Sequence, residues 1–174
     1  MTARAAPARA FAFVGNSGSG KTTLIERLIA RYRGEGLRVA AIKHAHHGFD
    51  LDVPGKDSWR LREAGATQVL VASPRRWALL VESESVPLRE HLARLDPCDL
   101  VLVEGFRSED AVPFLEVHRG GGGRDPGGRP DARALGLASS EARELAPRLA
   151  PLPVFELDDI ESIARFVHAR ALPP

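Results

Sequence analysis

The feature that most constrains this chain is the segment GNSGSGKT, which covers residues 15–22. The apolar run AFAFV precedes it, and a stretch with apolar residues at Leu24, Leu28 and Tyr32 follows it. This order predicts a buried strand, a glycine-rich turn and a helix. That is the setting that the phosphate-binding pattern G-x-x-x-x-G-K-[ST] requires, so we expect a P-loop here.

The chemistry of such a loop assigns roles to its residues. Glycines let backbone N–H groups turn inward around phosphate oxygens, and the start of the following helix adds partial positive charge. Lys21 is expected to reach the β and γ phosphates, and the Thr22 hydroxyl to bind Mg²⁺. The chain has 24 Lys and Arg residues but only three lysines, so each lysine invites a specific explanation. The predicted nucleotide-binding residues of the loop are Gly15, Asn16, Ser17, Gly18, Ser19, Gly20, Lys21, Thr22 and Thr23.

The rest of the chain alternates apolar strands with helices. This alternation predicts an α/β protein with the P-loop NTPase fold, a mainly parallel sheet with helices on both faces. We expect one nucleotide-binding domain over residues 10–174, a flexible leader at 1–9 and a mobile Gly/Pro loop at 120–132. The further strands are predicted at 37–44, 67–73, 77–83, 100–104, 114–119, 135–139 and 154–157. The helices are predicted at 21–33, 57–66 with Asp57 or Ser58 as N-cap, 87–95, and 158–170 with an acidic cap. The pair 67–73 and 77–83 is a candidate antiparallel pair.

Composition excludes several classes of function. The formal net charge is +1, which gives no bulk field to attract nucleic acid or a membrane surface. No apolar run approaches the length of about 20 residues that spans a bilayer. The single cysteine, Cys98, favours a reducing compartment, so we expect a cytoplasmic protein.

A P-loop site needs a carboxylate near Mg²⁺, at the carboxyl end of a neighbouring parallel strand. The segment DLVLVEG offers Asp99 and Glu104, about 16 Å apart along a strand, so only one of them can serve. In a parallel sheet Glu104 emerges at the same edge as the phosphate loop, and Asp99 at the opposite edge. We therefore predict that Thr22 and Glu104 hold the metal.

The segment KHAHHGFDLDVPGKDS, residues 43–58, gathers unusual polar chemistry at the same predicted edge. Lys43 is expected beside the phosphates, with His44, Asp50 or Asp52 facing a ligand, metal or partner. A zinc site from His44, His46 and His47 is an alternative, although adjacent histidines rarely converge on one ion. Lys56 and Asp57 either belong to this ligand loop or simply start the next helix.

Four segments, in order, resemble the molybdopterin-guanine dinucleotide biosynthesis protein B (MobB) family. They are GNSGSGKTTL, IKHAHHGFDLDVPGKDSWRLREAGA, DLVLVEGFR and LEVHR, and the closing PVFELDDIESIARFV fits as well. The resemblance implies a homodimeric GTP-binding protein with weak GTPase activity at most, an adapter more than an enzyme. It implies that the protein assists a MobA-type guanylyltransferase in attaching GMP to molybdopterin. It also implies that Glu116, His118 and Arg119 face the nucleotide or the pterin partner.

The chain departs from the family pattern at two places. Phe114 stands where a lysine is expected, and Ser139-Ser140 stands where family members often carry Ser-Asp. Guanine selectivity does not follow from the residues, since no Asn-Lys-x-Asp motif occurs. The only glutamine is Gln68, so none follows VEGF to orient water, and Arg107 is the one nearby candidate for charge stabilisation. We expect slow hydrolysis; a P-loop small-molecule kinase and a metal-delivery GTPase are the alternatives.

Overall fold

The computed structural model describes residues 9–45, 51–83, 86–120 and 130–172. The chain divides into two compact units, Met1–His44 with Pro87–Pro174, and Ala45–Val86. Each unit is described separately. The predicted leader, His46, His47, Asp50 and most of the predicted loop at 120–132 lie outside the described residues.

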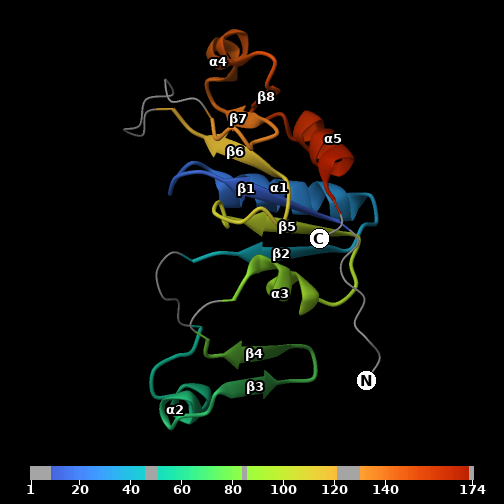
Figure 1. The fold of residues 1–174 in the computed structure, drawn as a ribbon. Coiled ribbons are helices and arrows are strands. Elements are labelled where there is room, and N and C mark those ends of the chain that lie inside the picture. Colours follow the sequence, from blue (N-terminus) through green and yellow to red (C-terminus); the bar gives the residue numbers. More distant parts are fainter. Residues whose placement is uncertain (1–8, 46–50, 84–85, 121–129, 173–174) are drawn as a thin grey trace. The chain divides into compact units, whose positions relative to one another are not determined.

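The larger unit is built on a six-stranded parallel sheet with strand order β2-β5-β1-β6-β7-β8 (Figure 1). The prediction of a mainly parallel α/β fold is confirmed. The strands are β1 (Ala10–Val14), β2 (Val39–Lys43), β5 (Leu100–Glu104), β6 (Phe114–His118), β7 (Leu137–Ser139) and β8 (Val154–Glu156).

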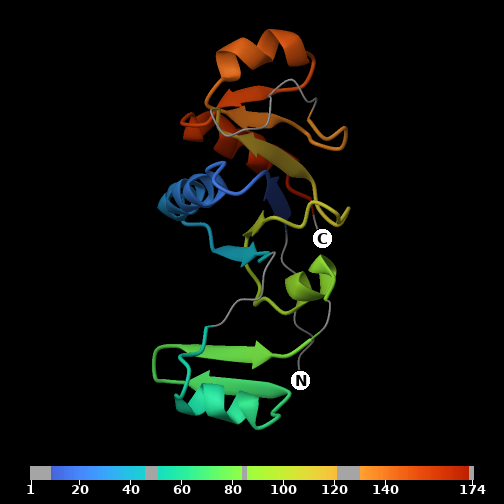
Figure 2. The same ribbon diagram turned by 90° about the vertical axis from the view of Figure 1, so that its left-hand side faces the viewer.

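Alternation along β1 divides the core between the two faces of the sheet. Phe11 and Phe13 pack with the apolar sides of α1 (Lys21–Gly34) and α5 (Ile160–Arg170). Ala12 and Val14 pack with α3 (Leu88–Ala93) on the other face. Figure 2 shows α1 and α3 on opposite sides of these strands. The strand that precedes the phosphate loop is thus enclosed on both faces.

The strand order places β1 between β5 and β6. In the parallel registers, Glu104 pairs with Phe13 of β1 and with Lys43 of β2. Val14 pairs with Glu116 of β6. The carboxyl ends of β2, β5, β1 and β6 therefore meet at one edge of the sheet. The loop at 15–20 emerges from this edge, as the sequence predicts.

Helix α3 differs from its predicted bounds, and one helix is new. Helix α4 (Ala142–Leu149) has no counterpart among the predicted elements, and it contains Pro147 near its end. Helix α3 is shorter than the predicted span of 87–95. Helix α5 has the expected acidic cap, because the backbone N–H of Ser162 donates to Asp159 Oδ1 over 3.1 Å.

The smaller unit consists of α2 (Asp57–Glu63), β3 (Gln68–Ala72) and β4 (Trp77–Val81). The two strands form an antiparallel sheet of their own, which confirms their orientation. The predicted N-cap of α2 is wrong: Lys56 occupies that position and no side chain caps the helix. Asp57 begins the helix instead, where its charge favours the partial positive end.

No helix among the described residues is long and apolar enough to cross a bilayer.

Candidate phosphate-binding site

Close packing explains the glycines at the two ends of the loop between β1 and α1. A Cβ atom on Gly15 would lie 2.2 Å from the carbonyl oxygen of Val117 in β6. Gly20 precedes α1 with φ +95°, a left-handed conformation, and a Cβ there would lie 3.2 Å from Arg119 Nη2. Glycine is needed at Gly15 to fit against β6 and at Gly20 to turn the chain into the helix.

Lys21 folds back over the loop. Its ammonium group donates to the carbonyl oxygens of Gly15 over 2.9 Å and Asn16 over 2.7 Å. It also lies 3.4 Å from the hydroxyl of Ser19, a buried residue. The loop thus supplies its own acceptors to the cation that a phosphate would engage.

The electrostatic environment of Lys21 favours an anion. Burial lowers the pKa of Lys21 below its ordinary value, an effect that Glu104 opposes and that Lys43 and Arg107 strengthen. Several cations are gathered around one partly buried ammonium group. An added anion relieves this repulsion.

Glu104 contacts both Thr22 at the start of α1 and Lys43 at the end of β2. The Thr22 hydroxyl donates to Glu104 Oε2 over 2.9 Å, and Lys43 Nζ lies 3.4 Å from Glu104 Oε1. The Glu104 side chain is only 14% exposed. The Thr22 hydroxyl and the Glu104 carboxylate lie next to each other, and both are hard oxygen ligands of the kind that Mg²⁺ prefers. The pair therefore fits this ion.

Asp99 lies at the other end of β5. Its carboxylate accepts from the backbone N–H of Arg38 over 2.7 Å and faces that residue's guanidinium at 3.4 Å. These interactions with Arg38 lower the pKa of Asp99. Asp99 has a local structural partner, which leaves Glu104 as the carboxylate beside the phosphate loop.

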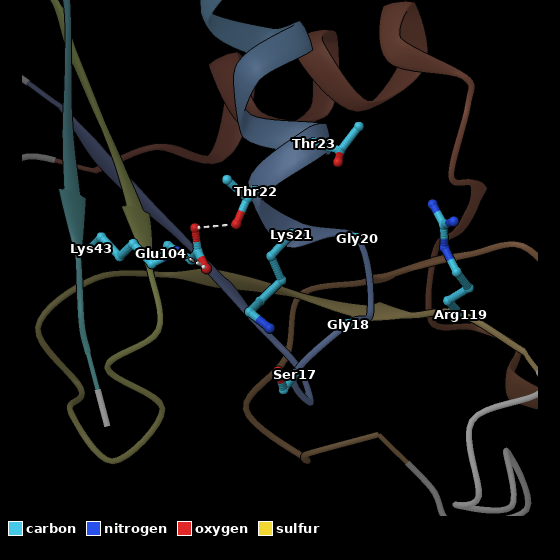
Figure 3. A pocket seen from close by; sticks show the side chains of 9 residues that line it. All are labelled: Ser17, Gly18, Gly20, Lys21, Thr22, Thr23, Lys43, Glu104 and Arg119. Carbon is cyan, nitrogen blue, oxygen red and sulfur yellow. Dashed lines mark hydrogen bonds and ion pairs between the residues drawn. The ribbon is translucent and has the colours of Figure 1, made fainter. Parts of the chain in front are cut away.

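Lys21, Thr22 and Glu104 line one pocket of about 320 Å³ (Figure 3). Its wall consists of Ser17, Gly18 and Gly20 of the loop, the first turn of α1 with Lys21, Thr22 and Thr23, and the side chains of Lys43, Glu104 and Arg119. Each is a position for which the sequence predicts a role. Figure 3 shows Glu104 and Arg119 on opposite sides of the loop.

Other predicted residues of the larger unit lie outside this wall. Glu116 is held by Arg107 over 2.7 Å and accepts from the backbone N–H of Asp131 over 3.0 Å. His118 Nδ1 lies 3.4 Å from Ser139 Oγ. The ring of His44 packs on Phe106, with 4.6 Å between their centroids.

The remaining predicted ligands belong to the smaller unit or are not described. Asp52 pairs with Arg62 over 3.0 Å, and Lys56 and Asp57 lie at the start of α2. Asp52 therefore has a structural interaction, which weakens its case as a residue that faces a ligand or metal. The described residues contain no group of three or more His, Cys, Asp or Glu side chains able to hold a metal. The zinc alternative depends on His46 and His47, which lie outside the described residues.

Two features of the larger unit were not predictable from motifs. Arg107 points to Glu116, an ion pair between segments nine residues apart that no spacing rule indicates. Phe114, where the family pattern has lysine, is 4% exposed and belongs to the core beneath α3. Arg133 lies 5.7 Å from the centre of its ring. This chain uses the position for packing.

Comparison with known sequences decides the family. The sequence model of MobB, described as molybdopterin guanine dinucleotide synthesis protein B, matches residues 10–138. The chain belongs to the MobB family. It is 39% identical over 161 residues to the molybdopterin-guanine dinucleotide biosynthesis adapter protein of Escherichia coli K12. The aligned region covers 90% of this chain and 89% of that protein. The adapter protein of Haemophilus influenzae is 46% identical over 108 residues, 60% of each chain.

Solved MobB structures share the fold. The crystal structure of Bacillus subtilis MobB is similar with a TM-score of 0.74 at 23% identity, and the match covers 95% of this chain and 99% of that one. A second crystal structure, of molybdopterin-guanine biosynthesis protein B, gives a TM-score of 0.64 at 28% identity. That match covers 92% of this chain and 98% of the other. The MobB likeness thus extends beyond residues 10–138 to nearly the whole chain.

Proposed function

We propose that this protein binds GTP with Mg²⁺ and serves as an adapter in the synthesis of molybdopterin guanine dinucleotide. Its partners would be molybdopterin and a MobA-type guanylyltransferase, and GTP hydrolysis would be slow. The observation that carries the proposal is the pocket in which Lys21, Thr22 and Glu104 meet at the end of β1. Membership of the MobB family, and relatives named as adapter proteins of this synthesis, support the pathway.

The phosphate part of the proposal rests on exchange of ligands at Lys21. The ammonium group now donates to the carbonyl oxygens of Gly15 and Asn16. Phosphate oxygens carry formal charge and give stronger hydrogen bonds than neutral carbonyls. The backbone N–H groups of the loop and the N-terminal end of α1 add further donors. A triphosphate can therefore displace the internal contacts of Lys21.

The metal part rests on Thr22 and Glu104. Mg²⁺ would supply charge neutralisation to the β and γ phosphates when it is bound. In this chain the Thr22 hydroxyl and the Glu104 carboxylate would hold it, and Lys43 beside Glu104 would limit how much negative charge the site carries. The same two residues contact each other over 2.9 Å, which places both donors at one position.

Slow hydrolysis is proposed because no glutamine lines the pocket in the part of the chain that the structure describes. No glutamine follows Glu104 in the sequence. Arg107 is held by Glu116 over 2.7 Å and does not line the pocket. Unassisted P-loop GTPases turn over at about 10⁻⁴ to 10⁻² s⁻¹. A turnover above about 1 s⁻¹ for the purified protein alone would contradict a primarily binding role.

The proposed homodimer has support from the smaller unit. In the register of β3 with β4, Leu70 faces Leu79, and Trp77 and Val81 lie on the same face of the sheet. All four side chains are exposed, by 38 to 60%. A two-stranded sheet is marginal alone and has open edges that pair with further strands. We therefore assign this apolar face to a second copy of the chain.

Light scattering after size-exclusion chromatography tests the dimer. Trp77→Lys combined with Leu79→Lys is expected to give a monomer. The matched control is Leu172→Lys, which changes an equally exposed leucine in the larger unit (57%) and should leave the dimer intact. A wild-type monomer, or a dimer that survives the double change, would refute the assignment.

Calorimetric titration tests the nucleotide proposal. GTP, ATP and molybdopterin are titrated separately, with and without Mg²⁺, into wild type and Lys21→Ala. Wild type should bind GTP and the pterin, and Lys21→Ala should lose GTP. Arg94→Ala, which removes an exposed cation at the end of α3 that does not line the pocket, is the control and should bind normally. ATP preference without pterin binding would favour a small-molecule kinase, and unchanged binding by Lys21→Ala would remove the basis of the proposal.

A further inference from the structure

The pocket has a metal end and an opposite end. Glu104 and Thr22 lie at one side of the phosphate loop, and Arg119 lies at the other (Figure 3). Thr22 and Glu104 would hold Mg²⁺, which would supply charge neutralisation to the terminal phosphates of a nucleotide. The γ-phosphate therefore belongs at the Glu104 side, and the α-phosphate and nucleoside leave the pocket on the Arg119 side.

The strands on that side are β6, β7 and β8, in this order away from β1. Their last residues lie in register, with His118 of β6 beside Ser139 of β7 and Ser139 beside Glu156 of β8. Leu157, directly after β8, reaches to 3.3 Å from the position of a Cβ on Gly20. The ends of β7 and β8 thus flank the nucleoside side of the loop.

Four carboxylates lie within three residues of these two strand ends, and three of them have a partner at 3.6 Å or less. Glu156 faces Arg143 at 3.6 Å. Asp158 pairs with Arg27 over 2.5 Å, and Asp159 accepts from the backbone N–H that starts α5. The fourth carboxylate is that of Glu141. Among the described residues, no group donates a hydrogen bond to it, and its nearest potential cation is His118 Nδ1 at 4.0 Å.

The local structure fixes Glu141 just after the end of β7 and against Gly120. Its backbone N–H donates to Oγ of Ser139, a fully buried residue, over 3.0 Å. Its carboxylate lies against Gly120, where an added Cβ would come within 1.9 Å of Glu141 Oε1. Gly120 directly follows Arg119 of the pocket wall. The Glu141 side chain is 32% exposed, so a ligand can reach it.

We propose that Glu141 is the residue that selects guanine, a role that rests on the proposed function. A carboxylate is an acceptor with two oxygens, and guanine presents two adjacent donors, N1–H and the 2-amino group. Adenine presents an unprotonated N1 at the same place, which a carboxylate repels. Glu141 thus supplies the acid that the Ser139-Ser140 sequence lacks, one residue further along the chain.

Nucleotide analogues test this assignment by calorimetry in the presence of Mg²⁺. The wild type is expected to bind GTP more tightly than ITP, which lacks the 2-amino group, and far more tightly than ATP. Glu141→Gln should lose about tenfold or more in GTP affinity, because a bidentate contact is broken, and should bind ATP no more weakly than the wild type, because the repulsion of adenine N1 is gone. The same variant should gain affinity for XTP, since the glutamine amide can donate to the 2-carbonyl oxygen of xanthine.

The control variant is Glu156→Gln, which removes a carboxylate from the neighbouring strand end and should leave all four affinities unchanged. An unaltered thermal melt and an ATP affinity no lower than that of the wild type show that Glu141→Gln is folded. If the wild type prefers GTP and Glu141→Gln keeps the same preference, Glu141 does not read the base, while the proposed function stands. Equal binding of GTP and ATP by the wild type also overturns the assignment. If no nucleoside triphosphate binds at all, the proposed function itself fails.

Discussion

Replacement of Glu104 by glutamine should strongly reduce the gain in nucleotide affinity that Mg²⁺ gives. Two oxygen ligands of one Mg²⁺ ion, each about 2.1 Å from it, lie about 4 Å apart or less. Without metal, a phosphate and Glu104 at that distance repel each other by about 1 kcal/mol in water and about 4 kcal/mol at an effective dielectric constant of about 20. The carboxylate is 14% exposed and Lys43 lies 3.4 Å from it, which reduces the net repulsion.

We take about 1.4 kcal/mol as the net repulsion between Glu104 and a phosphate, which corresponds to a tenfold change in affinity. In EDTA, Glu104→Gln should bind GTP about tenfold more tightly than the wild type, because the repulsion is gone. With Mg²⁺ it should bind about tenfold more weakly, because a metal ligand is lost. The ratio of the two affinities should therefore fall about 100-fold, which competition with a fluorescent nucleotide measures directly.

The control for this prediction is Asp99→Asn, at the opposite end of β5, where the carboxylate pairs with Arg38. That change should leave the ratio with and without Mg²⁺ as it is. If the ratio of GTP affinities with and without Mg²⁺ is the same for Glu104→Gln as for the wild type, the placement of the metal at Thr22 and Glu104 is refuted.

Two further changes test the structure around the site. Gly15→Ala places a Cβ 2.2 Å from the carbonyl oxygen of Val117, so it should destabilise the fold by about 1 to 3 kcal/mol in urea unfolding and weaken GTP binding; a variant as stable as wild type would contradict this packing. Arg133 lowers the pKa of Asp131 to about 2, so this carboxylate stabilises the fold above its unfolded pKa of 3.8, and the stabilisation is lost as pH falls toward 2. Asp131→Asn should therefore lower the melting temperature at pH 6 and have a shrinking effect between pH 4 and pH 2, and an effect that is equal at all pH values would exclude the ion pair as its cause.

The phosphate loop and its setting could be predicted because they are local. The spacing of Gly15, Gly20 and Lys21 is written in eight consecutive residues, and the strand before them and the helix after them follow from apolar periodicity. The placement of Glu104 needed only one more rule, that parallel strands carry their carboxyl ends to the same edge. Lys43 follows from the same rule.

The rest depends on contacts that sequence patterns do not encode. Helix α4 was missed because Pro147 is typical of a helix end, and here it lies in the last turn of a short helix. The strands Gln68–Ala72 and Trp77–Val81 and their antiparallel pairing were expected, but that they form a sheet separate from the six-stranded one depends on which strands the rest of the chain pairs with. The Arg107–Glu116 ion pair and the position of Glu141 beside Gly120 likewise join segments that only the fold brings together.

The position of β1 in the middle of the sheet has a consequence for how such a protein can diversify. The residues that would bind phosphate and metal emerge from four adjacent strands, β2, β5, β1 and β6, whereas β7 and β8 form the opposite border of the sheet. Substitutions along that border can retune which nucleoside is accepted while the anion cradle keeps its shape. Base specificity and phosphate binding thus depend on different strands of one sheet. A family built on this fold can change its base specificity without losing phosphate binding.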